Sequence, residues 1–245
     1  MQLTPTVKQL LIINVMVFIG CMFIPKAEAL FALFYFENPN FRLWQPLTHM
    51  FMHGGIMHIA FNMFALVSFG SLLEQFWGGH KFLFFYISCG LGAFLLHTGV
   101  NYYFYHEGIQ HLQSLGLEAQ IPEFLQTRRL NFNVRPAGLD EGILQNMLDA
   151  YNNPAVGASG AIYGLLTAFA FMFPNAELMM IFIPVPIKAK YFVPGLILLD
   201  LFSGVSGSAL MGGNIAHFAH VGGALTGFIM MWFWKKDQFR HNRWN

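Results

Sequence analysis

Two residues of this chain, a serine and a histidine, lie inside apolar stretches that are about sixty residues apart in the sequence. Ser159 lies in the sequence Gly157-Ala158-Ser159-Gly160, and the histidine is His220. Polar groups inside a membrane are costly and tend to mark function. A serine hydroxyl within about 2.6–3.2 Å of a histidine nitrogen forms a nucleophile–base pair. The two residues are therefore candidates for nucleophilic chemistry, provided that their helices meet.

Other polar groups accompany this pair. His58 and Asn62 are one helical turn apart, so they share one face of a helix. Further polar groups in or beside apolar stretches include His49, His53, Asp200 and His217. We interpret His49 and His53 as residues that build loop structure or hold water, and His217 as a structural residue.

The elements that carry these residues are long and apolar. The chain is 56% hydrophobic and 10% charged, whereas soluble domains carry about 25% charged residues. A helix of about 20 apolar residues crosses the hydrocarbon core of a bilayer. We therefore predict an all-α polytopic membrane bundle with six transmembrane helices, at about residues 8–25, 50–72, 82–104, 155–173, 190–206 and 214–234.

This topology brings the polar groups to a similar depth. The second, fourth and sixth segments all run from outside to inside, with their polar groups near their N-terminal ends. We expect Ser159 about five residues and His220 about six residues into their helices, roughly 7–9 Å below the outer boundary at 1.5 Å per residue. His58 and Asn62 lie somewhat deeper.

Small residues predict close contact between two of these helices. Gly160 and Gly164 form one stripe at i, i+4, and Ala219, Gly223 and Gly227 form a second. Such stripes let helix backbones approach closely in lipid. A serine side chain is short, so its hydrogen bond to a histidine on another helix needs this approach.

Lysine and arginine predict the orientation. With both termini in the cytoplasm, the inner loops and termini hold eight of these residues and the short outer loops hold two. We predict a single membrane domain over 1–245 with an extramembrane insertion at about 105–154. The segment Ser203–Gly213 is rich in Gly and Ser and is predicted to form a mobile cap over the site.

A resemblance to a known family rests on four stretches. They are Trp44 to Gly55, His58 to Asn62 as H-x-x-x-N, Gly157 to Gly160 as G-x-S-G, and Ala219 to Gly227 as A-H-x-x-G-x-x-x-G. In order, topology and spacing these stretches resemble the rhomboid family of intramembrane serine proteases. The sequence departs from the family at Gln45, where an arginine often follows the loop tryptophan, and in the insertion at about 105–154, which is longer than in minimal members. The first departure bears on the anchoring of the loop and not on the chemistry.

The resemblance implies a Ser–His dyad that hydrolyses peptide bonds in or near transmembrane segments. Ser159 is the implied nucleophile, and His220 is the base that takes its proton and returns it to the leaving amine. His58, Asn62 and the backbone N–H of Ser159 are the implied oxyanion donors. No cofactor is implied. We expect no acidic third member, because Asp200 lies on a different helix and in no motif.

Two alternatives remain beside a protease. In the first, a metal-dependent membrane protein, the pairs His49/His53 and His217/His220 at helical spacing would ligate zinc, but H-E-x-x-H is absent and no acidic residue neighbours these pairs in the sequence. The second alternative is a non-catalytic rhomboid-like protein that binds membrane helices. An aspartyl intramembrane protease is dismissed, since only Asp200 is available where two aspartates are needed.

The expected partners are transmembrane protein substrates and the lipid bilayer. No basic block suits nucleic acid. Both cysteines stand in apolar stretches, so a disulfide framework is not expected. The first residues show no transit-peptide pattern, which favours a bacterial inner (plasma) membrane.

Overall fold

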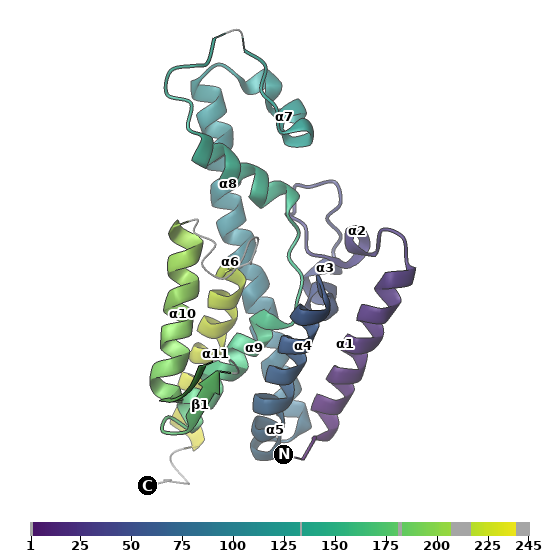
Figure 1. Cartoon of the computed structure of the whole chain (residues 1–245), viewed down its shortest axis with the longest axis vertical. Helices are drawn as coiled ribbons and strands as arrows, with labels where there is room; N and C mark the ends of the chain where they lie inside the picture. Colours follow the sequence, from purple (N-terminus) through teal and green to yellow (C-terminus); the bar gives the residue numbers. More distant parts are fainter. Residues whose placement is uncertain (1, 133, 181–182, 207–216, 239–245) are drawn as a thin grey trace.

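The chain forms a bundle of long helices with a smaller helical lobe at one end (Figure 1). The computed structural model describes residues 2–132, 134–180, 183–206 and 217–238. The long elements of the bundle are α1 (Pro5–Phe23), α4 (Ile56–Ala65), α5 (Ser71–Trp77), α6 (Gly79–Ser114), α9 (Ser159–Met172), α10 (Ala189–Ser206) and α11 (His217–Gln238). A π-helical turn at Leu66–Gly70 joins α4 to α5 without a break. Each of the six predicted segments therefore contains a helix, and the all-α membrane bundle is confirmed.

The membrane character of the bundle follows from its surface. Four described helical stretches are long and apolar enough to span a bilayer, namely α1, Ile56–Trp77, α6 and α10, while α9 is apolar but shorter. Large apolar side chains are exposed on the outer faces, among them Met16, Phe64, Leu95 and Leu198. A surface of this kind is unfavourable in water and suits lipid. The start of α1 and the end of α11 lie at the same end of the bundle, opposite the lobe (Figure 1).

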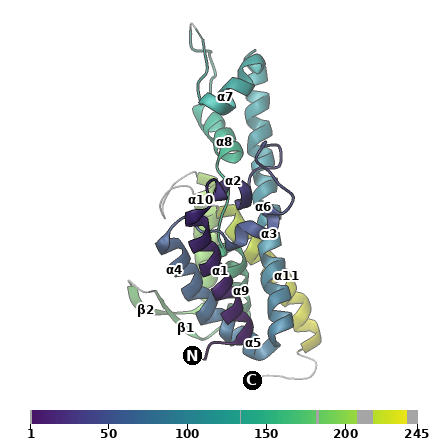
Figure 2. The ribbon, with the colours of Figure 1, turned by 90° about the vertical axis from the view of Figure 1, so that its right-hand side faces the viewer.

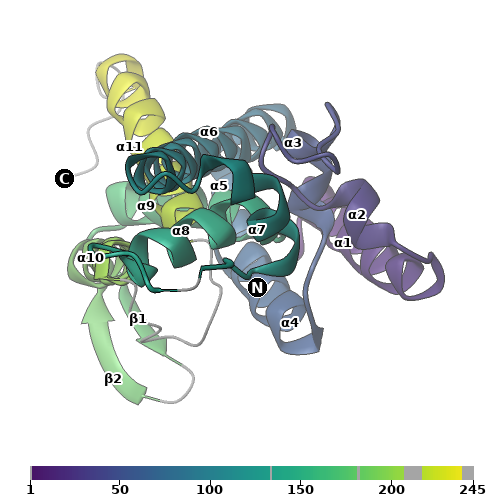
Figure 3. The same ribbon diagram turned by 90° about the horizontal axis from the view of Figure 1, so that it is seen from above.

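The inner faces of the helices form one apolar core. Its members come from α1, α4, α5, α6, α9, α10 and α11, and the fully buried ones include Phe82, Phe85 and Leu165. Seen from above, α10 and α1 stand at opposite edges of the bundle, with α9 between them (Figure 3). Buried Glu74 of α5 accepts hydrogen bonds from the backbone N–H groups of Thr6 and Val7, 2.9 Å each. This carboxylate satisfies amides that the first turn of α1 leaves free.

The lobe is built on the far end of α6. That helix is 36 residues long and runs ten residues past the predicted end of its span. Here α7 (Ile121–Thr127) and α8 (Glu141–Asn152) follow a 3-10 turn at Glu118–Gln120 and pack around a second apolar cluster (Figure 2). A Cβ on Gly108 would lie 2.5 Å from Met147 Cβ, so the glycine lets α8 rest on α6. The extramembrane position of 105–154 stays a prediction.

The loop before α4 contains α2 (Ala27–Phe31), α3 (Gln45–Thr48) and a 3-10 turn at His49–Phe51. Gln45 is fully buried and ties the loop together. Its Oε1 accepts from the Phe34 N–H at 3.2 Å, and its Nε2 donates to the carbonyls of Asn40 and Ala29 at 2.9 and 3.3 Å. The position that departs from the family pattern is therefore an anchor of this loop.

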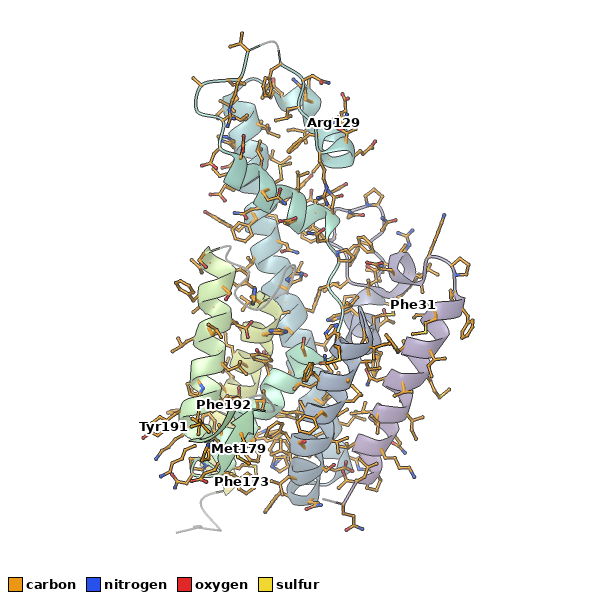
Figure 4. The ribbon with its side chains drawn as sticks, viewed as in Figure 1. Phe31, Arg129, Phe173, Met179, Tyr191 and Phe192 are labelled. Carbon is orange, nitrogen blue, oxygen red and sulfur yellow. The ribbon has the colours of Figure 1, made fainter. Side chains whose placement is uncertain are left out.

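An antiparallel hairpin joins α9 to α10, with β1 at Glu177–Met180 and β2 at Ile183–Lys188. It projects from the bundle at the end opposite the lobe (Figure 2). Side chains of Phe173, Met179 and Tyr191 gather at this end of the molecule (Figure 4). The hairpin cannot be predicted from the sequence, because short apolar strands beside apolar helices have no distinct periodicity.

Candidate functional site

The site begins with a close contact between α9 and α11. A Cβ on Gly223 would lie 1.8 Å from the carbonyl oxygen of Gly160, and a Cβ on Gly227 would lie 2.8 Å from Gly164 Cα. Neither position has room for a side chain. The two helix backbones therefore touch along the stripes of small residues, as the sequence predicts.

This contact brings Ser159 and His220 together. His220 Nε2 lies 2.8 Å from Ser159 Oγ, within hydrogen-bond distance. The ring of Tyr163, one turn along α9, stacks on the His220 ring with centroids 4.3 Å apart and planes 11° from parallel. Two residues 61 positions apart in the sequence thus form a hydrogen-bonded pair, and the tyrosine fixes the plane of the imidazole.

The start of α9 differs from the prediction. The helix begins at Ser159 rather than at about residue 155, so the serine is its first residue and not its fifth. Gly157 has φ +125°, a conformation that L side chains rarely adopt. Its N–H donates to the His49 carbonyl at 2.9 Å, and Ala155 pairs with Leu33. An extended segment, instead of a helical turn, therefore leads the chain down to Ser159.

His58 faces the same point from α4. A Cβ on Gly157 would lie 2.8 Å from His58 Nε2 and 3.6 Å from Ser159 Oγ, so the missing side chain leaves space between them. The Gly54 N–H lies 3.3 Å from His58 Nδ1 and can only donate to it. The ring proton of neutral His58 is then on Nε2. His58 therefore offers an N–H donor toward the space beside Ser159.

Asn62 of α4 is hydrogen-bonded to the backbone of its own helix. Its Nδ2 donates to the His58 carbonyl at 2.8 Å, which fixes the orientation of the amide because a carbonyl can only accept. The Asn62 Oδ1 is buried and has no partner in the described part of the chain. Among the described hydrogen bonds, none joins Asn62 to Ser159. The backbone N–H of Ser159 is at the first position of α9, where helical amides lack an intrahelical partner.

A small pocket lies beside the serine. Its volume is about 20 Å³, which is room for about one water molecule. Its lining includes Ser159, Gly157, His49 and Ala219. Burial lowers the pKa of His49 to about 4, so its ring is neutral at pH 7. Because its Nδ1 donates to the Gln45 carbonyl at 2.9 Å, its Nε2 is an acceptor.

Comparison with known proteins assigns the family. Residues 40–117 and 100–236 match the rhomboid domain. The chain belongs to the rhomboid family. It is 24% identical over 186 residues to Rhomboid protein 1, mitochondrial, of Saccharomyces cerevisiae. The matched region covers 76% of this chain and 40% of that protein.

Two further relatives show the range of the rhomboid matches. Presenilin-associated rhomboid-like protein A, mitochondrial, of Danio rerio is 25% identical over 225 residues, 91% of this chain and 46% of that protein. Rhomboid protease GluP of Bacillus subtilis is 42% identical over 48 residues, 20% of this chain and 10% of that protein. This rhomboid therefore spans less than half the length of the relatives that it matches broadly.

One residue of the rhomboid site was missed by the sequence analysis. Asp200 of α10 is 5% exposed, and its Oδ1 lies 3.2 Å from His220 Nδ1 and 2.6 Å from His217 Nδ1. Its Oδ2 accepts from the Tyr163 hydroxyl. An acidic residue therefore does lie against His220. A single aspartate in an apolar helix was the feature of the sequence that could have marked Asp200 as functional. Its spacing from His220 in the sequence did not indicate that the two residues meet.

The same side chains are also a candidate metal cluster. One ligand atom from each of Asp200, His217 and His220 lies within 4.8 Å of the others. Two imidazoles and a carboxylate form a donor set that suits zinc. In this structure each of the two histidines is hydrogen-bonded to Asp200.

His53 and the predicted cap at Ser203–Gly213 are the two other features that the sequence singled out near the site. His53 is buried, both of its ring nitrogens lack partners in the described part of the chain, and its ring lies edge-on to His58 at 5.1 Å. Its role in building the loop or holding water stays a prediction. Of the predicted cap, residues 203–206 end α10, and residues 207–213 lie outside the described residues.

Proposed function

We propose that this rhomboid is an intramembrane serine protease that hydrolyses peptide bonds in or near transmembrane segments of membrane proteins. The observation that carries the proposal is the 2.8 Å contact between Ser159 Oγ and His220 Nε2 inside an apolar bundle. A serine hydroxyl is a weak nucleophile until a base accepts its proton. The membrane-exposed apolar surface supports substrates that are themselves membrane helices.

The proposed reaction has two halves. In the first, Ser159 Oγ attacks the substrate carbonyl carbon while its proton passes to His220 Nε2. The tetrahedral intermediate collapses, the C–N bond breaks, and His220 gives the proton to the leaving amine. In the second half, water repeats the attack on the acyl-enzyme, His220 takes its proton, and Ser159 leaves with that proton. Both residues end as they began.

The oxyanion of the intermediate needs donors that are already in place. His58 Nε2–H faces the space beside Ser159, and the Ser159 amide opens α9. A preorganised donor of this kind stabilises a transition state by about 3–4 kcal/mol. Asn62 is the third proposed donor and has one amide hydrogen beyond the one given to His58. The pocket beside Ser159, which has room for about one water molecule, is the proposed reservoir for the second half.

The membrane is part of the proposal. The distribution of lysine and arginine favours cytoplasmic termini. The yeast and zebrafish relatives carry mitochondrial names, whereas the Bacillus subtilis relative is bacterial. We propose a bacterial inner membrane with both termini in the cytoplasm. Fractionation of cells expressing the tagged chain, with protease protection of both termini, tests this directly. Recovery with mitochondria, or termini on the opposite side, contradicts it.

The decisive experiment compares wild type with Ser159→Ala in detergent. Both receive a fluorescent transmembrane peptide and, separately, a serine-reactive fluorophosphonate probe. Ser114→Ala, an exposed serine of the lobe, is the matched control. We expect cleavage and labelling by wild type and the control only. Equal behaviour of wild type and Ser159→Ala contradicts the protease and favours the non-catalytic helix-binding alternative.

A further inference from the structure

Asp200 stands at a point where three hydrogen-bond donors converge. His220 Nδ1 and His217 Nδ1 of α11 both face its Oδ1, at 3.2 and 2.6 Å, and the Tyr163 hydroxyl of α9 faces its Oδ2. The carboxylate reaches them because α10 packs against both α11 and α9 (Figure 1). Its surroundings otherwise belong to a membrane bundle, where an unpaired charge is very costly. Three donors provide the compensation that a buried carboxylate requires.

This arrangement decides the position of a proton on His220. An ionised carboxylate can only accept, so the ring nitrogen that faces it must carry hydrogen. That nitrogen is Nδ1. In the neutral ring the lone pair is then on Nε2, which is the atom 2.8 Å from Ser159 Oγ. The tautomer that Asp200 selects is the one that can accept the serine proton.

We propose that Asp200 is a positioning residue for His220, holding the imidazole in the tautomer and orientation that accept the Ser159 proton, so that three helices supply a Ser–His–Asp triad. This inference rests on the proposed protease function and deepens it. Asp200 acts through His220 and touches neither the substrate nor the reacting atoms.

The proton does not reach Asp200 in this scheme. When Ser159 attacks, its proton moves to His220 Nε2, and the ring becomes an imidazolium with hydrogen on both nitrogens. The Asp200 carboxylate stabilises this positive charge, since its Oδ1 lies 3.2 Å from His220 Nδ1. The Tyr163 hydroxyl, which donates to Oδ2, and His217 Nδ1, which faces Oδ1, also hold the carboxylate in place.

A matched set of variants tests the positioning role. Asp200→Asn keeps the size of the side chain but removes its charge, and its amide can donate to Nδ1 and select the wrong tautomer. Asp200→Glu keeps the charge. Asp149→Asn makes the same chemical change on α8, within the lobe. Wild type is the positive control and Ser159→Ala is the negative control. For each protein, kcat and KM for the transmembrane peptide, the rate of fluorophosphonate labelling and thermal unfolding in detergent are measured.

We expect Asp200→Asn to lower kcat and the labelling rate by at least about 100-fold, since the corresponding change in a soluble serine protease costs about 10⁴-fold. KM should stay within about threefold, because the substrate does not touch Asp200. Asp200→Glu should recover part of kcat, and Asp149→Asn should match wild type. If Asp200→Asn keeps kcat within about threefold of wild type while Ser159→Ala is inactive, the positioning role is wrong and the proposed protease function is retained. If Ser159→Ala cleaves the peptide like wild type, the positioning role and the protease function are both wrong.

A measurement on the wild type keeps the inference testable even if Asp200→Asn does not fold. In protein labelled with ¹⁵N-histidine, the nitrogen shifts of His220 report which ring nitrogen carries hydrogen. The His220 signals are identified by their loss in His220→Gln. Hydrogen on Nδ1 in the neutral ring is the expected result, and hydrogen on Nε2 overturns the proposal.

A chelator separates hydrogen bonding from metal binding at the same residues. We expect wild-type cleavage to be unchanged after incubation with a strong zinc chelator. Activity that is lost on chelation and restored by Zn²⁺ would make Asp200, His217 and His220 metal ligands, and would overturn the positioning role.

Discussion

Gly223 of α11 and Gly160 of α9 touch backbone to backbone, and this contact sets the distance between Ser159 and His220. A side chain at position 223 would overlap the Gly160 carbonyl oxygen, with its Cβ only 1.8 Å away. A short serine side chain cannot span a wider gap between helices. The hydrogen bond of the site therefore depends on two residues that have no side chain.

Gly223→Ala is expected to separate α9 from α11. Overpacking of this kind costs about 1–3 kcal/mol, and a shift of about 1 Å between reacting groups lowers rates about 100-fold. Thermal unfolding in detergent and fluorophosphonate labelling measure the two effects. Gly99→Ala in α6 is the control, because a Cβ there meets no atom within 4 Å. Equal labelling of both variants would show that the Gly160 contact does not set the Ser159–His220 geometry.

His58→Ala removes the side-chain donor that faces the space beside Ser159. The expected loss in kcat is about 10²–10³-fold, the usual effect of deleting one oxyanion donor. Binding of the peptide should change little, because the donor acts on charge that develops in the transition state. His80→Ala, at the exposed start of α6, serves as the control in the same peptide assay. A fall in affinity with unchanged kcat would assign His58 to substrate binding instead.

Gln45→Ala tests the anchor of the loop before α4. The change leaves the Phe34 N–H and the Asn40 carbonyl without their partner. Leaving one buried polar group unsatisfied costs about 1–3 kcal/mol, so unfolding in detergent should occur at a clearly lower temperature. Gln113→Ala, an exposed glutamine at the end of α6, should unfold like wild type. An unshifted transition for Gln45→Ala would mean that the loop has other sufficient anchors.

Gly108→Val is expected to dislodge α8 from α6 while the bundle stays intact. A Cβ at position 108 would overlap the Met147 side chain. The lobe has its own apolar cluster, separate from the core that surrounds Ser159. Limited proteolysis should therefore cut within residues 115–152 faster than in wild type, while fluorophosphonate labelling persists. Gly99→Val in the same helix is the control. Loss of labelling with Gly108→Val alone would tie the lobe to the site.

The sequence by itself determined the membrane bundle, because each apolar stretch long enough to cross a bilayer can be recognised from its own residues alone. It also determined the contact of α9 with α11, since small residues at i, i+4 mark a helix face that can approach a neighbour. The pairing of Ser159 with His220 followed from these two features, although Ser159 is the first residue of α9 and not the fifth.

Only the tertiary structure decided which other groups meet the pair. Whether Asp200 faces His220 depends on the rotation of α10 about its axis and on its height against α11, and the packing of the whole bundle sets both. The extended approach to Ser159 depends on a backbone conformation at Gly157 and on its bond to His49, a distant residue. Hydrogen bonds between residues far apart in the sequence leave no periodic pattern along it, so local spacing could not reveal them.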